Sequence, residues 1–153
     1  MIKLRTVTLD DAQTIFQWRN EPYIVNLGSL RKTVIWEEHL SWMKDTVRGI
    51  NRKAFIIEIN NIPAGQIRFD LHSQNSCFVS VYLIKEFAGK GYGIEFIKLG
   101  CATIFLQWEQ VKIIYALVRR DNEVGNKAFI KAGFLLDTTI EDIEHIGYSL
   151  TND

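Results

Sequence analysis

Residues 81–94 read VYLIKEFAGKGYGI, the most informative stretch of the chain. It starts as a run of β-forming residues and continues through glycines at every second position, Gly89, Gly91 and Gly93. The pattern predicts a buried strand, a glycine-rich turn and a helix that begins near Tyr92. Glycines let the backbone approach a ligand, and the N–H groups of the turn and of the helix start then form an anion site suited to a pyrophosphate.

This turn differs from two common phosphate-binding loops. No Gly-Lys-Ser/Thr follows it, which excludes a Walker loop, and its Gly-x-Gly-x-Gly spacing lacks the ribose-binding acid of the dinucleotide fingerprint. A strand that reverses into a helix can also require glycines for conformational reasons alone. The turn by itself does not decide between a ligand site and a simple chain reversal.

A second segment begins with a predicted buried strand over 112–118, continues through Asp121 and Asn122, and ends in a helix closed by Ala-Gly-Phe134. In order and spacing, residues 81–134 resemble the acetyl-CoA-binding half of the GCN5-related N-acetyltransferase (GNAT) superfamily. The resemblance implies a GNAT fold, in which the strand before the turn splays from its neighbour. It also implies acetyl-CoA as the acetyl donor.

The resemblance further implies how the chain holds acetyl-CoA. Backbone groups at the end of the strand hold the pantetheine arm, N–H groups of the turn hold the pyrophosphate, and two asparagines flank the thiol end. The implied cofactor-binding residues are Leu83, Ile84, Lys85, Gly89, Lys90, Gly91, Tyr92, Gly93, Ile94, Asn122 and Asn126.

Two positions depart from the family pattern. The Arg or Gln that usually opens the turn is Ala88, and Lys85 and Lys90 are the cations that could replace it. The tyrosine that protonates the departing thiolate in many relatives corresponds to Phe129, which cannot donate a proton. Because a CoA thiol resembles a free cysteine, with a pKa of about 8.5, its unassisted departure is tolerable near neutral pH.

The N-terminal half narrows the acceptor. Stretches 16–20 (FQWRN), 38–42 (EHLSW) and 65–70 (GQIRFD) resemble the GNAT subgroup that acetylates an amino group on a nucleotide-linked deoxysugar, such as the pseudaminic-acid pathway enzymes of bacterial surface-glycan synthesis. Protein N-terminal acetyltransferases of the ribosomal-protein type share the Trp-Arg-Asn and His-x-x-Trp patterns in these stretches. Both halves extend the resemblance over most of residues 2–135. The implied acceptor-binding residues are Trp18, Arg19, Asn20, Trp42, Arg68 and Asp70.

A helix predicted over 33–48 carries the candidate base. Its apolar stripe is expected to face the core and consists of Trp36, Leu40, Met43 and Val47. His39 and Trp42 lie on the neighbouring line of the helix. His39 is predicted to face the acceptor pocket as base or hydrogen-bond donor, with Trp42 as an apolar wall for a sugar or uracil ring. The alternative is a partly buried histidine packed on an aromatic side chain.

A β-hairpin is predicted around the turn pair at 60–61, and its second strand sends Gln66, Arg68 and Asp70 to one face, as a pocket wall would. Arg19 and Arg68 are predicted to bind a nucleotide diphosphate, since guanidinium groups suit phosphate oxygens. Ion pairing with a nearby acid such as Asp70 is the alternative. Tyr82 is a second catalytic candidate if it faces the acceptor rather than the core.

Helical and strand-like patterns alternate, so the predicted class is α/β (α+β), with a mixed central sheet of about six or seven strands, splayed central strands and helices on both faces. Further strands are expected over 2–7 and 77–84, and weaker ones over 135–140 and 145–150. Without a linker or repeat, residues 1–153 are interpreted as a single GNAT acetyltransferase domain.

The composition excludes several other classes. Among 153 residues, 18 Lys plus Arg balance 18 Asp plus Glu, whereas a nucleic-acid binder would show a basic excess. Cys77 and Cys101 are too few for a disulfide framework and are not at metal-ligand spacing. No signal peptide or membrane span is evident. We therefore expect a cytoplasmic protein with a small-molecule amine acceptor and no metal, nucleic-acid or membrane partner; a homodimer stays open.

The predicted reaction is a direct transfer. A base or a water chain through His39 takes the proton of the amine, and a strand N–H near Leu83 stabilises the charge on the carbonyl oxygen. Two other functions stay open. A protein N-terminal acetyltransferase would need an acidic groove rather than cations such as Arg19. Ala88 and Phe129 are compatible with a non-catalytic acyl-CoA-binding module.

Overall fold

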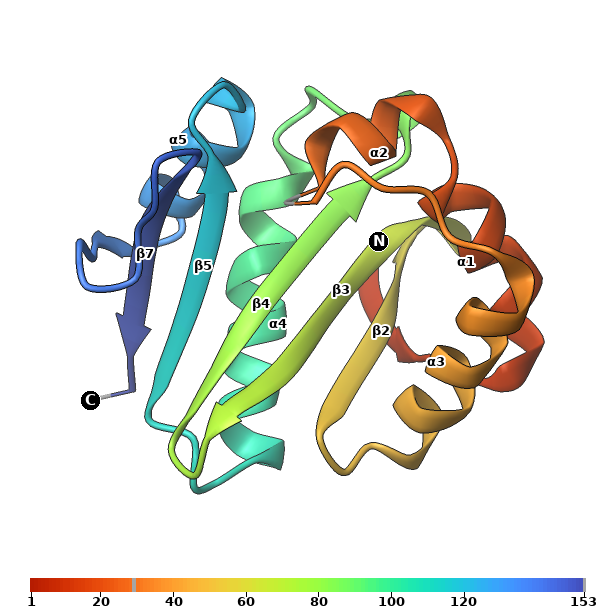
Figure 1. Cartoon of the computed structure of the whole chain (residues 1–153), viewed down its shortest axis with the longest axis horizontal. Coiled ribbons are helices and arrows are strands. Elements are labelled where there is room, and N and C mark those ends of the chain that lie inside the picture. The colour runs from red at the N-terminus through yellow and green to blue at the C-terminus, as the bar shows by residue number, and fades with distance from the viewer. Residues whose placement is uncertain (29, 153) are drawn as a thin grey trace.

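In the computed structural model, which describes residues 1–28 and 30–152, seven strands form one mixed sheet in the order β1-β2-β3-β4-β5-β7-β6 (Figure 1). Among the neighbouring strands of these described residues, only β4 and β5 are parallel. The strands are β1 (Ile2–Thr6), β2 (Arg52–Ile59), β3 (Ile62–Ser73), β4 (Ser76–Leu83), β5 (Ile113–Arg119), β6 (Leu135–Leu136) and β7 (His145–Thr151). The helices are α1 (Ala12–Arg19), α2 (Pro22–Leu27), α3 (Trp36–Arg48), α4 (Tyr92–Gln107) and α5 (Glu123–Lys131), with short 3₁₀ turns η1 (Leu9–Asp11) and η2 (Lys85–Phe87).

The parallel strands β4 and β5 separate along their length. Residues 76–78 of β4 pair with 113–115 of β5, although β4 continues to Leu83 and β5 to Arg119. The two strands diverge toward their carboxyl ends, where α2 and the loop after β4 lie (Figure 1). The mixed sheet and the splayed central strands predicted from the sequence are confirmed.

The two faces of the sheet bury different side chains because successive strand residues point to opposite sides. On one face, Ile57 and Ile67 pack with α4 in the larger core. Gly100 permits this close packing, since a Cβ there would lie 2.6 Å from Cδ1 of Ile67. On the other face, Ala54 and Ile56 pack under α1 and α3 in a smaller core. Helices therefore cover both faces, as predicted.

Between α1 and α3 the chain forms a short helix, α2, that no sequence pattern indicated. α2 starts with Pro22 in its first turn and has six residues, too few to show a helical period. α3 begins at Trp36 rather than near Thr33 and ends at Arg48, and the left-handed backbone of Gly49 (φ 69°) caps it.

The core-facing line of α3 was predicted wrongly in part. Met43 is fully buried as expected, but Trp36 and Val47 are 38% and 42% exposed. His39 and Thr46 are buried in their place. Both polar side chains have internal partners, Thr46 through a 2.7 Å hydrogen bond from its hydroxyl to the Trp42 carbonyl. A hydrophobic period cannot identify polar residues that face inward with their hydrogen bonds satisfied.

The helices of residues 1–28 and 30–152 include none with both the length and the apolar content that crossing a bilayer requires.

Candidate active site

The loop between β4 and α4 contains the three glycines. Gly89 (φ 75°) and Gly91 (φ 85°) have left-handed backbones, which other residues rarely adopt. Gly91 is also the N-cap of α4, and no side chain caps that helix. A Cβ added at Gly89, Gly91 or Gly93 would meet no atom within 4 Å, so this backbone borders open space.

The backbone donors of this loop suit an anionic ligand. The first N–H groups of α4, at Tyr92, Gly93 and Ile94, have no acceptor inside the helix, and the helix dipole makes this end electropositive. Lys85 and Lys90 are exposed in the same loop. Converging donors, positive charge and open space together fit the pyrophosphate of acetyl-CoA.

The end of β4 connects this loop to the splayed edge. Leu83 pairs with Gly65 of β3, and the Ile84 N–H donates to the Ala64 carbonyl at 2.8 Å. Gly65 is required here because a Cβ would lie 2.1 Å from the Tyr82 carbonyl oxygen. One edge of β4 is thus fixed by β3, while in the described chain the other edge has no strand partner after residue 78. An extended pantetheine arm fits such an edge.

Asn122 and Asn126 lie across the splay, at the start of α5. The Oδ1 of Asn122 accepts the Gly125 N–H at 2.9 Å and caps the helix. The Nδ2 of Asn126 donates to the carbonyls of Arg119 (3.0 Å) and Asn122 (2.8 Å), and its Oδ1 accepts the Tyr148 hydroxyl (2.6 Å). Both asparagines shape the turn after β5, and the contact with the thiol end predicted for them stays a prediction.

On the face of the sheet opposite α4, three arginines surround Trp42. The guanidinium carbons of Arg19, Arg52 and Arg68 lie 4.5, 4.9 and 5.6 Å from the Trp42 ring centroid, within cation–π range. We call Arg19, Trp42, Arg52 and Arg68 the arginine cluster. Trp42 was predicted to be a wall for a sugar or uracil ring, and in the structure its ring faces guanidinium groups.

The cluster retains an excess of positive charge. Asp70 accepts from Nε of Arg52 at 2.5 Å and from Nε of Arg68 at 3.1 Å, and exposed Asp45 lies 3.5 Å from Arg52. Within residues 1–28 and 30–152, no carboxylate comes within ion-pair distance of Arg19. Burial, together with the charges of Arg68 and Arg52, lowers the pKa of Arg19. A guanidinium in this setting is stabilised by an incoming anion.

His39 lies beneath the cluster with its side chain fully buried. Its Nε2 lies 2.7 Å from the Ala12 carbonyl oxygen, and its Nδ1 lies 3.1 Å from NH1 of Arg19. Burial and the Arg19 charge lower the pKa of His39, although the hydrogen bond to Ala12 opposes this. Both ring nitrogens are engaged inside the protein, so the contacts favour a role through Arg19; the predicted role as base stays untested.

Tyr82 lies between the arginine cluster and the splay. Its hydroxyl donates to Oε1 of buried Gln66 at 2.8 Å, and its ring meets Trp18 edge to face at 6.2 Å. Burial raises the pKa of Tyr82, and this exceeds the opposing effects of Arg19 and Arg68. The phenol is therefore protonated at neutral pH and acts as a hydrogen-bond donor. Its predicted catalytic role stays a prediction.

Asn20 differs from the other residues predicted to bind the acceptor. Its Nδ2 donates to the Val34 carbonyl at 2.9 Å and its Oδ1 accepts the Val34 N–H at 2.7 Å. Asn20 thus joins the end of α1 to the segment before α3, and its predicted contact with the acceptor stays untested. The structure brings Trp18, Arg19, Trp42, Arg68 and Asp70 together on one face.

Arg52 belongs to this site but was not predicted, because the expected strand began at Ala54. The hairpin register places Arg52 opposite Asp70 and Ala54 opposite Arg68. Starting the first strand of the predicted hairpin two residues earlier would have included Arg52 in the site.

With this geometry in place, comparison with known proteins decides the family. Residues 2–135 match the family described as acetyltransferase (GNAT) domain. The chain is a member of the GNAT family. It is an acetyl-CoA-dependent N-acetyltransferase, as predicted.

Individual relatives agree with this assignment. The GNAT chain is 28% identical over 151 residues to "Acetyltransferase PseH" of Campylobacter jejuni subsp. jejuni serotype O:23/36 (strain 81-176), covering 95% of this chain and 92% of the relative. A structure of Campylobacter jejuni N-acetyltransferase PseH with acetyl coenzyme A superposes with a TM-score of 0.75 at 22% identity, covering all of both chains. The AAC(6')-Ib complex with ribostamycin and coenzyme A superposes with a TM-score of 0.85 at 17% identity, covering 99% of this chain and 93% of the other.

The structure shows the contacts of Ala88 and Phe129, the two residues that depart from the GNAT pattern. Ala88 ends η2, its N–H donating to the Lys85 carbonyl at 3.2 Å. Phe129 is buried and stacks on Tyr148, with ring centroids 6.2 Å apart. The Tyr148 hydroxyl already donates to Asn126, so this nearby phenol is engaged and does not replace the missing tyrosine in the structure as it stands.

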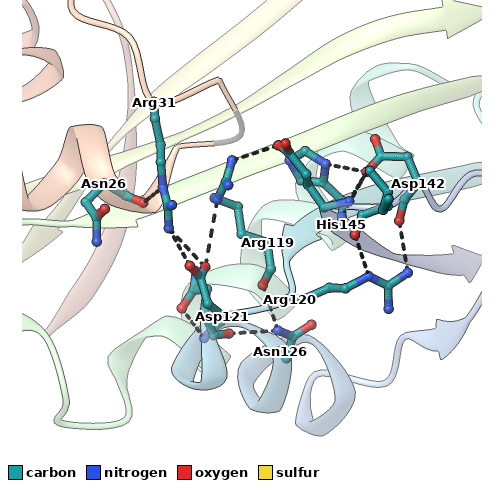
Figure 2. A network of polar contacts seen from close by, with 12 residues as sticks. Asn26, Arg31, Arg119, Arg120, Asp121, Asn126, Asp142 and His145 are labelled. Carbon is teal, nitrogen blue, oxygen red and sulfur yellow. Dashed lines mark hydrogen bonds and ion pairs between the residues drawn. The ribbon is translucent and has the colours of Figure 1, made fainter.

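A polar network links the segments around this GNAT site (Figure 2). NH2 of Arg31, which follows α2, contacts both carboxylate oxygens of Asp121 after β5, at 3.0 and 2.8 Å. Arg119 continues the network to Glu144 at 3.4 Å. His145 is buried, with 7% of its surface exposed, and its Nδ1 lies 2.8 Å from Asp142 Oδ1. Asp142 lies three residues before His145, on the loop that leads into β7.

Proposed function

We propose that this GNAT transfers the acetyl group of acetyl-CoA to an amino group of a sugar linked to a nucleotide diphosphate. The observation that carries the proposal is the arginine cluster on the acceptor face. Three guanidinium groups converge there, and the carboxylates nearby do not neutralise them all. Because the chain has no net charge, this local excess is what would attract a diphosphate.

The position of the cluster supports a sugar between the phosphates and the reacting amine. Arg68 pairs across the sheet with Ser80, and Leu83 lies three residues further along β4. At 3.3 Å per residue this is roughly 10 Å, which leaves room for a sugar ring. Trp18 and Tyr82 border the same space with aromatic surfaces. Pseudaminic-acid synthesis for bacterial surface glycans, the pathway expected from the resemblance, would supply such an acceptor.

The residues divide the work between two sides of the sheet. When bound, acetyl-CoA supplies an activated acetyl thioester. N–H groups of residues 89–94 would hold its pyrophosphate, and the free edge of β4 would hold its pantetheine arm. On the acceptor side, the arginine cluster would orient the diphosphate so that the neutral amine is aimed at the splay, and Tyr82 would border the sugar as a donor. Positioning of this kind accounts for much of the rate in direct transfer.

The decisive experiment follows thiol release from acetyl-CoA with three acceptors. These are a nucleotide-linked amino-deoxysugar, the same amino sugar without the nucleotide, and a peptide with a free N-terminus. We expect kcat/KM for the nucleotide-linked sugar to exceed that of the free sugar at least tenfold. Equal values would refute diphosphate recognition, and a preference for the peptide would favour a protein N-terminal acetyltransferase. Thermal stabilisation by acetyl-CoA without turnover of any acceptor would indicate a non-catalytic module.

A further inference from the structure

His39 is held in one protonation state by its two partners. Arginine has no hydrogen-bond acceptor on its guanidinium, so the Nδ1 that faces NH1 of Arg19 must carry a lone pair. The Ala12 carbonyl can only accept, so Nε2 must carry the proton. The two contacts together fix a neutral imidazole with its proton on Nε2.

The ring is also held in position by aromatic packing. The Trp42 ring stacks on it at 6.0 Å with 20° between the planes. Phe16 and Trp36 pack on it at 5.4 and 5.8 Å. The backbone bond to Ala12 and these three rings therefore define the direction in which Nδ1 points.

Arg19 depends on this direction more than its neighbours do. Arg52 and Arg68 are oriented by the Asp70 carboxylate, which also neutralises part of their charge. For Arg19, the described polar side-chain partner is Nδ1 of His39, and its other support is the Trp42 ring. A neutral nitrogen orients a guanidinium without cancelling its charge, so the full charge stays available to a ligand.

We propose that His39 is a positioning residue whose Nδ1 holds Arg19 over Trp42 in the orientation that binds the anionic group of the acceptor. This rests on the proposed function, because the acceptor must carry such an anionic group. The role differs from the predicted one: His39 acts through Arg19 and takes no proton from the amine.

Two substitutions separate the nitrogens of His39. His39→Asn places an amide oxygen close to the Nδ1 position and retains an acceptor for Arg19. His39→Gln places an amide nitrogen close to the Nε2 position and retains the donor to Ala12. We expect His39→Gln to raise KM for the acceptor about tenfold, with kcat and KM for acetyl-CoA within twofold of the unmodified protein. His39→Asn should keep KM for the acceptor within about threefold.

Two further measurements complete the design. In an Arg19→Ala background, His39→Gln should have no added effect on KM for the acceptor, because the residue it positions is gone. His72→Asn, a change of the same type at an exposed histidine, should leave all constants unchanged. Circular dichroism and thermal unfolding verify that each variant is folded.

Specific outcomes would overturn the proposal. Equal KM values in the Asn and Gln variants would show that Nδ1 does not position Arg19. A loss of kcat in both variants with unchanged KM would assign His39 as the base, since neither amide accepts a proton. If the unmodified protein turns over only peptides, the proposed function fails separately. The role of His39 is then tested by calorimetry, which measures the affinity for inorganic pyrophosphate in the presence of saturating CoA. A weaker affinity in His39→Gln, but not in His39→Asn, supports the positioning role. Equal affinities in the two variants and the unmodified protein refute it.

Discussion

Asp70 and His39 hold arginines of one cluster in different ways. A carboxylate orients a guanidinium and cancels part of its charge, whereas a neutral imidazole only orients it. The cluster combines both, so Asp70 orients Arg52 and Arg68 while the imidazole of His39 orients Arg19. In the proposed function, the balance between these two partners would set how much positive charge the acceptor meets.

Arg52 provides a direct test of this charge, with a matched control beside it. Arg52→Gln removes a cation that lies 4.9 Å from the Trp42 ring, and we expect KM for the nucleotide-linked acceptor to rise about tenfold, as the loss of one charge-assisted hydrogen bond would cause. Lys53→Gln removes the next charge on β2, but Nζ of Lys53 points to Gln107 at 3.1 Å, away from the cluster. Steady-state kinetics should show an unchanged KM for this variant; equal effects would mean that the charge acts only at long range.

The buried histidine also predicts how stability depends on pH. Its pKa is lowered from 6.5 in the folded protein, so below about pH 6.5 the unfolded chain binds a proton that the native state does not. The free energy of unfolding should therefore fall as the pH drops below that value. Arg19 is the charged group that faces the ring, and on the other sides lie the Ala12 carbonyl and aromatic rings.

Urea unfolding between pH 5 and 7.5 gives the free energy of unfolding of the unmodified protein and of His39→Asn. Because the same carboxylates titrate in both proteins, the difference between the two curves isolates the contribution of His39. His39→Asn should show a flatter pH dependence in this range. Parallel curves would show that His39 is not the group responsible.

At the scale of elements, substitutions of glycine in two turns can distinguish the cost of backbone strain from a loss of ligand binding. Gly91→Ala forces a side chain into a left-handed conformation at φ 85°, and Gly49→Ala does the same at φ 69° after α3. Both Cβ atoms would meet open space, so each variant should lose roughly 1–2 kcal/mol of unfolding free energy. We expect only Gly91→Ala to raise KM for acetyl-CoA as well. A rise of equal size in Gly49→Ala would place the effect in global stability instead.

The elements that the sequence predicted well are those with an unambiguous hydrophobic period or with turn residues at their ends. The hairpin of β2 and β3 alternates around Asn60 and Asn61, both of which have positive φ in the structure, and α4 follows its glycines as expected. α2 is too short to show a period, and β6 has two residues where a longer strand was expected. In α3 the hydrophobic pattern selected a line that is partly exposed, because two inward polar residues satisfy their hydrogen bonds internally.

The candidate site was predictable where it is made of backbone groups and less so where side chains meet across elements. Gly89, Gly91 and Gly93 mark the turn between β4 and α4 by residue type and spacing alone, and the family pattern that follows them makes this turn a candidate ligand site. The arginine cluster assembles from α1, α3, β2 and β3, so Arg52 could be placed only with the strand register. The hydrogen bonds that engage both nitrogens of His39 depend on the packing of α1 against α3, which no local pattern encodes.

At the scale of the whole molecule, the splay of β4 from β5 divides the sheet into two parts. Ligand binding between them should slow amide hydrogen exchange in residues 79–84, 89–94 and 116–119. The β1–β2 ladder, which is complete without ligand, should change little. Exchange measured by mass spectrometry with and without CoA tests this. Protection confined to the face of α3 would place the cofactor on the wrong side of the sheet and contradict the assignment.

The short pairing of residues 76–78 with 113–115 is the part of β4 that β5 holds directly. Leu83 lies five residues beyond the last paired residue of β4, a distance of roughly 17 Å at 3.3 Å per residue. A rotation of about 5° around that pairing would move the strand end by about 1.5 Å, while the paired residues barely shift. We therefore expect the separation of β4 and β5 beside Leu83 to depend on the end of the sheet that is farthest from the glycine loop, so that substitutions around Cys77 should change the candidate cofactor site without touching either substrate.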